Sequence, residues 1–181
     1  MHGTFFSYTP GAITVSFRHG DFDYIELSLL LRGDVRTETP CDASMEPSKP
    51  AEHVRPDLRL ETFVSSAHCP FFDLIAWLEA ITCNVQECAF GWDAEGPEGR
   101  LDWQRGSPDG NGFLEVTWTP NDTKHRVMLS RHQLVAEFYN GFRAFVESPA
   151  YDLQRDESPR AFGASLQNLR STVIEHWLTD Q

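Results

Sequence analysis

The sequence predicts an α+β fold for this chain of 181 residues: an antiparallel meander sheet with helices packed on one of its faces. Two observations predict this class. Four short stretches of alternating apolar residues follow one another between residues 88 and 129, with turn residues between them. Apolar residues at helical spacing occupy the segments on both sides of this block. We expect residues 1–181 to form one domain, which is what this length favours.

Three further strands are predicted before the first helix. Apolar and polar residues alternate at 13–18 and again at 22–31, with a turn between the two stretches, and the alternation resumes at 58–64. Residues 32–57 contain four prolines in a polar run with hardly any large apolar residue. Because proline lacks the N–H that a strand needs for its ladder, we expect a long mobile loop there.

The first helix is predicted to begin at Pro70 and Phe71, because proline at this position loses no hydrogen bond. The meander after it has one apolar and one polar face. The apolar face is formed by Cys88, Phe90, Trp92, Leu101, Trp103, Leu114, Val116, Trp118, Val127 and Leu129. The polar face is formed by Glu87, Asp93, Asp102, Gln104, Glu115, Thr117, Thr119 and Arg126. We expect helices to cover the first face and solvent to reach the second.

Two helices after the meander supply this cover. Ser130 and Gln133 match a capping box at the start of a helix over 131–146, and Gly141 inside it indicates close approach of another element. A polar linker at 150–163 leads to a last helix at 165–178. Its inward side chains are expected to be Leu166, Leu169, Val173 and Trp177.

Charge limits the partners of this protein. Fifteen lysines and arginines against 27 aspartates and glutamates give a net charge of −12. Such a chain repels nucleic acid and anionic lipid and attracts basic proteins. The acidic residues are concentrated, since residues 73–115 hold nine of them against two arginines. A solvated surface that keeps the protein in solution explains the same charge, so the alternative of no binding role stays open.

No apolar run has the length of a membrane span and no secretion signal opens the chain, so we expect a cytoplasmic protein with no membrane partner. Thiols stay reduced in the cytoplasm, so we expect structural, buried cysteines without disulfides. These are Cys41, Cys69, Cys83 and Cys88. Their spacing lacks the close pairs typical of structural zinc, and we predict no metal and no cofactor.

The sequence contains none of the common catalytic motifs, such as a nucleophile elbow or a phosphate-binding loop, so we predict no catalytic residue. Sites assembled from distant residues leave an alternative open. This alternative is a small enzyme or ligand-binding domain with a cleft between sheet and helices. Its acid–base groups would be Glu79, His68 or His132. A third reading, an acidic mimic of nucleic acid, rests on charge alone.

One resemblance follows from the helical run FFDLIAWLEAI at 71–81, the tryptophan-rich meander and the helix over 133–146. Together they resemble small stand-alone immunity proteins of bacterial polymorphic toxin systems. The resemblance covers about half of the chain and transfers no site residue to it. It implies a cytoplasmic, acidic, non-catalytic inhibitor that caps a cognate toxin.

The function expected from charge and motifs together is an interaction protein that binds and neutralises a basic protein partner. We expect the partner-binding residues around the turn at Gly96 and Pro97, where acidic residues attract a cationic surface and a partly exposed tryptophan at a strand end anchors it. These residues are Trp92, Asp93, Glu95, Glu98 and Asp102. The sequence does not predict an oligomeric state.

Overall fold

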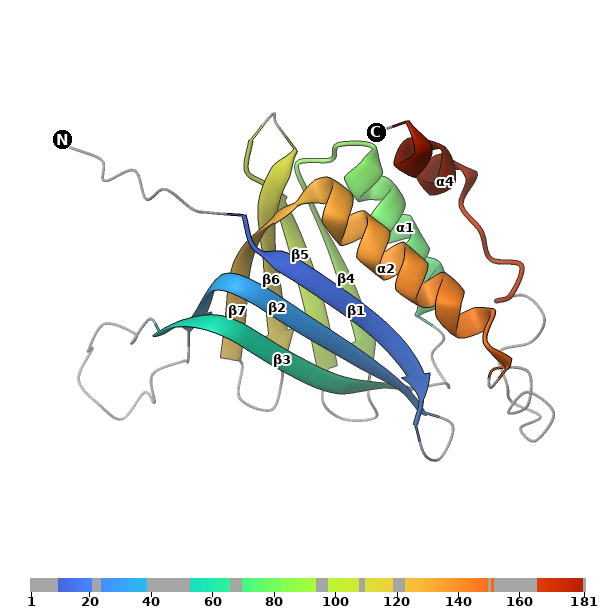
Figure 1. Cartoon of the computed structure of the whole chain (residues 1–181), viewed down its shortest axis with the longest axis horizontal. Helices are drawn as coiled ribbons and strands as arrows, with labels where there is room; N and C mark the ends of the chain where they lie inside the picture. Colours follow the sequence, from blue (N-terminus) through green and yellow to red (C-terminus); the bar gives the residue numbers. More distant parts are fainter. Residues whose placement is uncertain are drawn as a thin grey trace.

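One antiparallel sheet of seven strands dominates the described part of the chain, and three helices lie on one side of it, the last of them packed on the other two (Figure 1). This computed structural model describes residues 10–20, 24–38, 53–65, 70–93, 98–107, 110–118, 123–149, 151 and 166–180. The predicted α+β class with an antiparallel sheet is therefore confirmed.

The first three strands are β1 (Ala12–His19), β2 (Tyr24–Glu38) and β3 (His53–Ser65). Most of β2 lies between β1 and β3, and its last three residues pair with β7 instead of β1. The register of β2 against β3 shifts between Arg32 and Val35, and Gly33 there has a φ of 112°. This bulge bends β2 and lets one strand join both halves of the sheet.

The predicted loop over 32–57 is too long. Strand β2 continues to Glu38, with Val35 and Thr37 buried, and β3 begins at His53. Pro56 has no partner on β2 and lies opposite the bulge on an edge strand, where its missing N–H removes no ladder bond. The remaining loop residues, 39–52, lie outside the described residues, as do 152–163 of the predicted linker.

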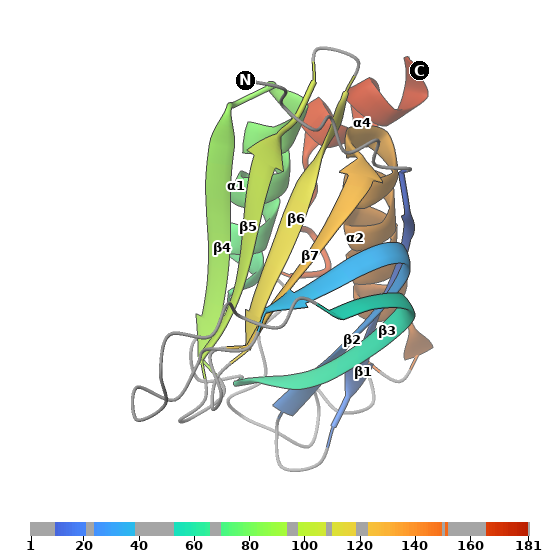
Figure 2. The ribbon, with the colours of Figure 1, turned by 90° about the vertical axis from the view of Figure 1, so that its left-hand side faces the viewer.

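The predicted meander is formed by β4 (Glu87–Asp93), β5 (Glu98–Arg105), β6 (Asn111–Trp118) and β7 (Thr123–Ser130), each paired with the next (Figure 2). Its apolar face is buried as predicted, with Leu101, Leu114 and Leu129 fully enclosed. The side chain of Trp118 lies outside the described part.

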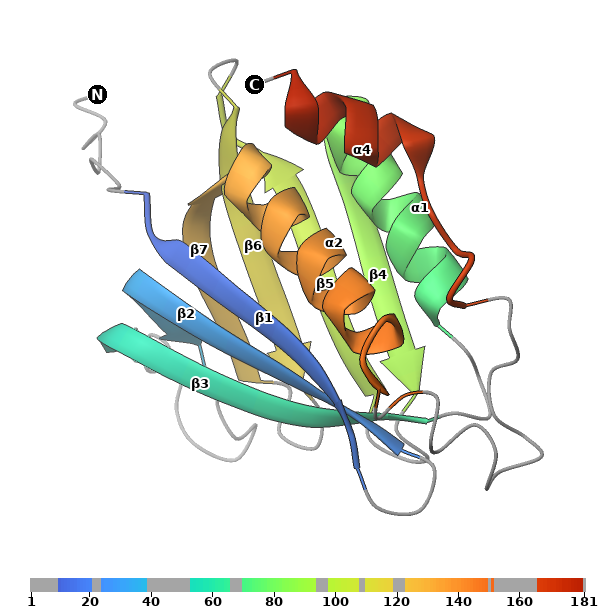
Figure 3. The ribbon, with the colours of Figure 1, turned by 45° about the vertical axis from the view of Figure 1, so that its right-hand side comes forward.

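The helices lie together on the apolar side of the sheet (Figure 3). Helix α1 (Phe71–Thr82) packs on β4, and α2 (Arg131–Val146) packs mainly on β1. The cap at Ser130 is confirmed, because its hydroxyl accepts a hydrogen bond from the Gln133 N–H at 3.5 Å. The close approach predicted at Gly141 is also confirmed: a Cβ there would lie 2.9 Å from the backbone oxygen of Val15.

The last helix is shorter than predicted: α4 spans Thr172–Thr179. Ser171 caps it, accepting a hydrogen bond from the Ile174 N–H at 3.1 Å, so the helix begins six residues after the buried Leu166. Its buried residue is Ile174, whereas Val173, expected to point inward, is 47% exposed. The later start explains the error. Because Leu166 and Leu169 lie before the helix, their spacing does not indicate which of its residues face inward.

None of the helices in the described ranges is long and apolar enough to cross a membrane.

Candidate functional site

The polar face of the meander carries side chains in rows that run across the strands. One row consists of Ala89, Asp102, Glu115, Arg126 and Arg36, which are successive partners on β4, β5, β6, β7 and β2. The next consists of Gly91, Arg100, Thr117, Lys124 and Glu38. Like charges therefore lie directly opposite each other in the first row, an arrangement that destabilises a sheet unless ions of the other sign lie nearby.

The second row supplies these compensating charges. Arg100 Nε donates hydrogen bonds to both carboxylate oxygens of Asp102, at 3.0 and 2.8 Å, and its Nη2 donates a third at 2.7 Å. Lys124 Nζ donates to Glu115 Oε1 at 2.8 Å. These bonds raise the pKa of Arg100 and of Lys124, because each carboxylate favours the charged form of its partner. The two carboxylates in the middle of this face are thus locally neutralised.

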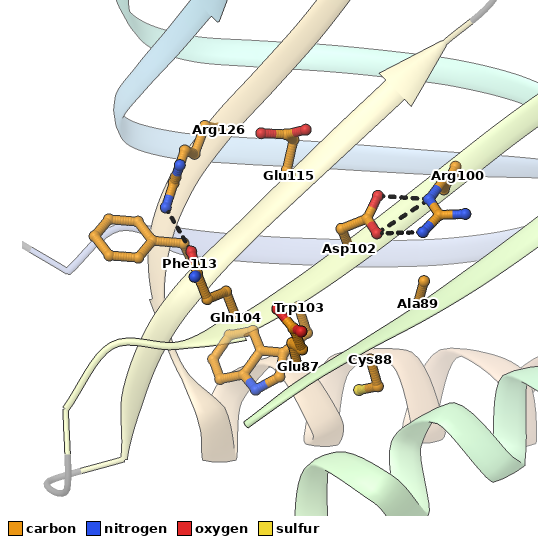
Figure 4. Close-up of a pocket in the computed structure, with 10 residues that line it drawn as sticks. All are labelled: Glu87, Cys88, Ala89, Arg100, Asp102, Trp103, Gln104, Phe113, Glu115 and Arg126. Carbon is orange, nitrogen blue, oxygen red and sulfur yellow. Dashed lines mark hydrogen bonds and ion pairs between the residues drawn. The ribbon is translucent and has the colours of Figure 1, made fainter. Parts of the chain in front are cut away.

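A hollow of about 540 Å³ opens on this face (Figure 4). Arg126 forms its border on β7: its Nη2 donates to Gln104 Oε1 at 2.9 Å, and its guanidinium carbon lies 4.4 Å from the ring centre of Phe113. On the opposite border Ala89 and Glu87 belong to β4. The strand alternation placed Arg126 and Gln104 on this face, but the contact of Arg126 with Phe113 depends on a register that the sequence does not show.

The structure brings together two of the predicted site residues. Asp93 and Glu98 are direct cross-strand partners at the end of the β4–β5 hairpin, and both are exposed. Asp102 lies further along β5, in its ion pair with Arg100. Glu95 and the Gly96-Pro97 turn lie outside the described residues.

The expectation of a partly exposed Trp92 is wrong. Its side chain is 5% exposed, its Nε1 donates to Thr62 Oγ1 on β3 at 3.3 Å, and its ring lies 5.6 Å from that of Phe90. The indole also lies across Gly99, its partner on β5. The sheet curls, so that β3 approaches the end of β4. Strand β3 thereby covers Trp92, which the meander alone would leave at a surface. Trp92 therefore fastens β4 to the core.

A buried polar pair lies at the β2–β7 junction. Thr37 Oγ1 and His125 Nδ1 are 3.0 Å apart, and the two residues are direct partners between these strands. Burial lowers the pKa of His125, and the nearby Arg55 guanidinium lowers it further, so the neutral ring is favoured.

The cysteines differ from expectation. Cys83 is exposed just after α1, and Cys88 is half-buried on β4; both are free thiols. Burial, with a smaller effect from the Asp102 carboxylate, raises the pKa of Cys88 to about 11, so its thiol stays protonated at neutral pH. Cys83 is exposed because it terminates the helix, where the apolar stripe has already ended. Cys41 and Cys69 lie outside the described residues.

Glu79 and His132, two of the acid–base groups of the alternative reading, each have a different neighbour on the C-terminal segment. Glu79 Oε1 accepts from the Ser171 hydroxyl at 2.6 Å and so holds the C-terminal segment on α1. His132 lies on α2 beside the ring of Trp177, at 5.5 Å. His68 lies outside the described residues. Glu79 thus has a structural partner that the sequence did not indicate, because Ser171 is 92 residues away.

Within the described ranges, no three His, Cys, Asp or Glu side chains form a group that could hold a metal ion. Comparison of the chain with protein-family models, with curated proteins and with solved structures finds no match.

Proposed function

We propose that this protein is a non-catalytic, cytoplasmic binding protein that engages a basic protein partner at the tip of the β4–β5 hairpin and on the adjoining polar face. The partner we propose is a bacterial toxin domain, which the bound protein would neutralise. The observation that carries the proposal is the pairing of Asp93 with Glu98.

Like charges directly opposite each other on neighbouring strands destabilise a sheet. Asp93 and Glu98 form such a pair, and both side chains are exposed at the end of the β4–β5 hairpin, where a partner can reach them. Two exposed carboxylates this close together attract a cationic surface. The net charge of −12 would also accelerate the encounter with such a surface.

The test is association kinetics with purified toxin domains encoded beside the gene for this chain. Reversing Asp93, Glu95 and Glu98 to Lys should slow association about tenfold or more at low salt and leave the circular dichroism spectrum unchanged. Because salt shortens the screening length to about 8 Å at physiological strength, the wild-type rate should fall with salt while dissociation changes less.

A matched control changes the net charge equally elsewhere. Asp34, Asp57 and Glu137, on β2, β3 and α2, would be reversed to Lys in one variant. The proposal requires this variant to associate faster than the hairpin variant. Equal rates for the two variants, or a hairpin variant as fast as wild type, would contradict it.

A second function, binding of a small ligand, is favoured by the hollow beside Arg126 and Phe113. This site lies on the polar face rather than between sheet and helices, where the alternative reading expected a cleft. A small-molecule thermal-shift screen tests it: a ligand that stabilises wild type but not an Arg126→Ala variant would support it.

A further inference from the structure

The outer edge of β4 has backbone groups that point away from the sheet. The Arg105 N–H donates to the Gln86 oxygen at 2.9 Å. This bond shows that Gln86 and every second residue after it direct their backbone groups toward β5. Because residues on a strand alternate in the direction of their N–H and C=O groups, Ala89 and Gly91 direct theirs to the opposite side. Neither has a hydrogen-bond partner there among the described residues.

This edge is accessible and held in place. Ala89 and Gly91 are exposed, and β4 forms the margin of the meander, with no labelled element beyond it (Figure 2). Two indole N–H groups hold the strand on its buried side. Trp92 donates to Thr62 Oγ1, and Trp77 donates to the Cys88 oxygen at 3.4 Å. A rigid edge loses little entropy when another strand is added to it.

Strands β3 and β4, each paired with one other strand, differ in how their free edges are protected. Strand β3 carries the devices that block strand addition: Pro56, the bulge opposite it, and a run of charged side chains along its exposed face. These charged residues are Arg55, Asp57, Arg59 and Glu61. The centre of β4 carries only the small Ala89 and Gly91. An edge that is left unprotected in this way is a template for pairing.

Charge indicates what kind of strand would fit. Glu87 and Asp93 lie exposed at the two ends of β4, and the hollow of about 540 Å³ opens directly beside Ala89. The small residues leave room for long side chains of an added strand to reach over β4 toward Glu87 at the border of this hollow (Figure 4). Lysine or arginine at alternate positions meets that requirement.

We propose that the outer edge of β4 accepts an extended, basic segment of the partner as an additional strand of the sheet. The proposal rests on the proposed function, since it names how the basic partner binds. Main-chain hydrogen bonds to Ala89 and Gly91 hold the segment, and its cationic side chains lie beside Glu87 and Asp93.

The probe is a synthetic peptide of alternating lysine and threonine, seven residues long to match β4. Amide hydrogen exchange of the full chain is measured by NMR with and without the peptide. At saturation the exchange rates of the Ala89 and Gly91 amides should fall at least about tenfold, while the amides of β3 keep their rates. A peptide with glutamate in place of lysine should leave all of these rates unchanged.

Two variants complete the test. Ala89→Pro removes an outward N–H but no bond to β5, and should weaken the lysine peptide at least about tenfold. Val54→Ala changes an exposed side chain on β3, outside the proposed edge, so it should bind within about twofold of wild type. If Ala89→Pro does not fold, the exchange rates of the wild type decide the question alone.

The outcomes separate this proposal from the proposed function. A peptide that fails to bind, or one that binds without slowing exchange at Ala89 and Gly91, overturns strand addition. The proposed function would then still stand or fall on the rates of the hairpin charge variants with toxin domains. Slower exchange at β4, present with lysine and absent with glutamate, supports strand addition.

Discussion

Replacing Gly99 with Ala tests whether Trp92 is fixed in the core. A Cβ at Gly99 would overlap the indole ring and lie 2.7 Å from its Nε1, whereas real Cβ atoms essentially never approach a neighbour within 3.0 Å. The ring cannot yield freely, because it is bonded to Thr62 and packed on Phe90. The added methyl group must therefore displace the ring, which then loses its hydrogen bond to Thr62.

The expected cost of Gly99→Ala follows from these two effects. Overpacking costs about 1–3 kcal/mol and loss of the buried hydrogen bond about 1 kcal/mol, so the free energy of unfolding should fall by about 2–4 kcal/mol. With a urea dependence of about 2 kcal/mol per molar, the unfolding midpoint should fall by about 1–2 M. Far-UV circular dichroism in urea measures it.

Gly91→Ala is the matched control, because Gly91 lies on the neighbouring strand and a Cβ there meets only the Gly99 oxygen, at 3.7 Å. Its effect should stay within about 0.5 kcal/mol. In a Trp92→Leu background the Gly99 substitution should lose most of its cost, because the overlapping ring is gone. Equal costs for the two glycine substitutions would refute the reasoning, as would an undiminished cost without the indole.

Three further outcomes are expected. Leu114→Ala should lower the free energy of unfolding by about 2–5 kcal/mol in urea, since the side chain is fully buried; a loss below about 0.5 kcal/mol would place it on the wrong face. Deleting residues 39–51 should leave circular dichroism unchanged, because loop closure depends weakly on length and the flanking Thr37 and His53 are already strand partners; loss of the folded spectrum would show a structural role. The lowered pKa of His125 means that the unfolded chain binds its proton first, so stability should fall as pH drops below about 6.5; a His125→Gln variant should lose this part of the pH dependence, and unchanged titration would refute it.

The sequence predicted the elements whose patterns are local. The alternation in β4 to β7 and the apolar stripe of α1 needed only their own residues, and the faces of the meander were assigned correctly for the side chains that the structure describes. The extent of β2 was not predictable in this way. Its residues beyond Gly33 become a strand because β7 and β3 pair with them, and those partners lie far away in the chain.

The same distinction between local patterns and pairing of distant strands applies to the candidate site. The polar residues of the face, Asp102 and Arg126 among them, followed from alternation within each strand. The burial of Trp92 did not, since Thr62 on β3 is its partner from 30 residues away. The hairpin pairing of Asp93 with Glu98 was implied by the turn between them, but the ion pair of Lys124 with Glu115 depends on the register of β6 against β7.

The bulge in β2 has a consequence for folding cooperativity. The three-stranded unit of β1 to β3 and the meander of β4 to β7 each consist of strands close in sequence, whereas the pairing of Arg36 with Arg126 joins them across about half of the chain. Because contacts between residues far apart in sequence form more slowly than local ones, we expect this junction to form after the two units. The few residues after Gly33 therefore control whether two local folding units behave as one.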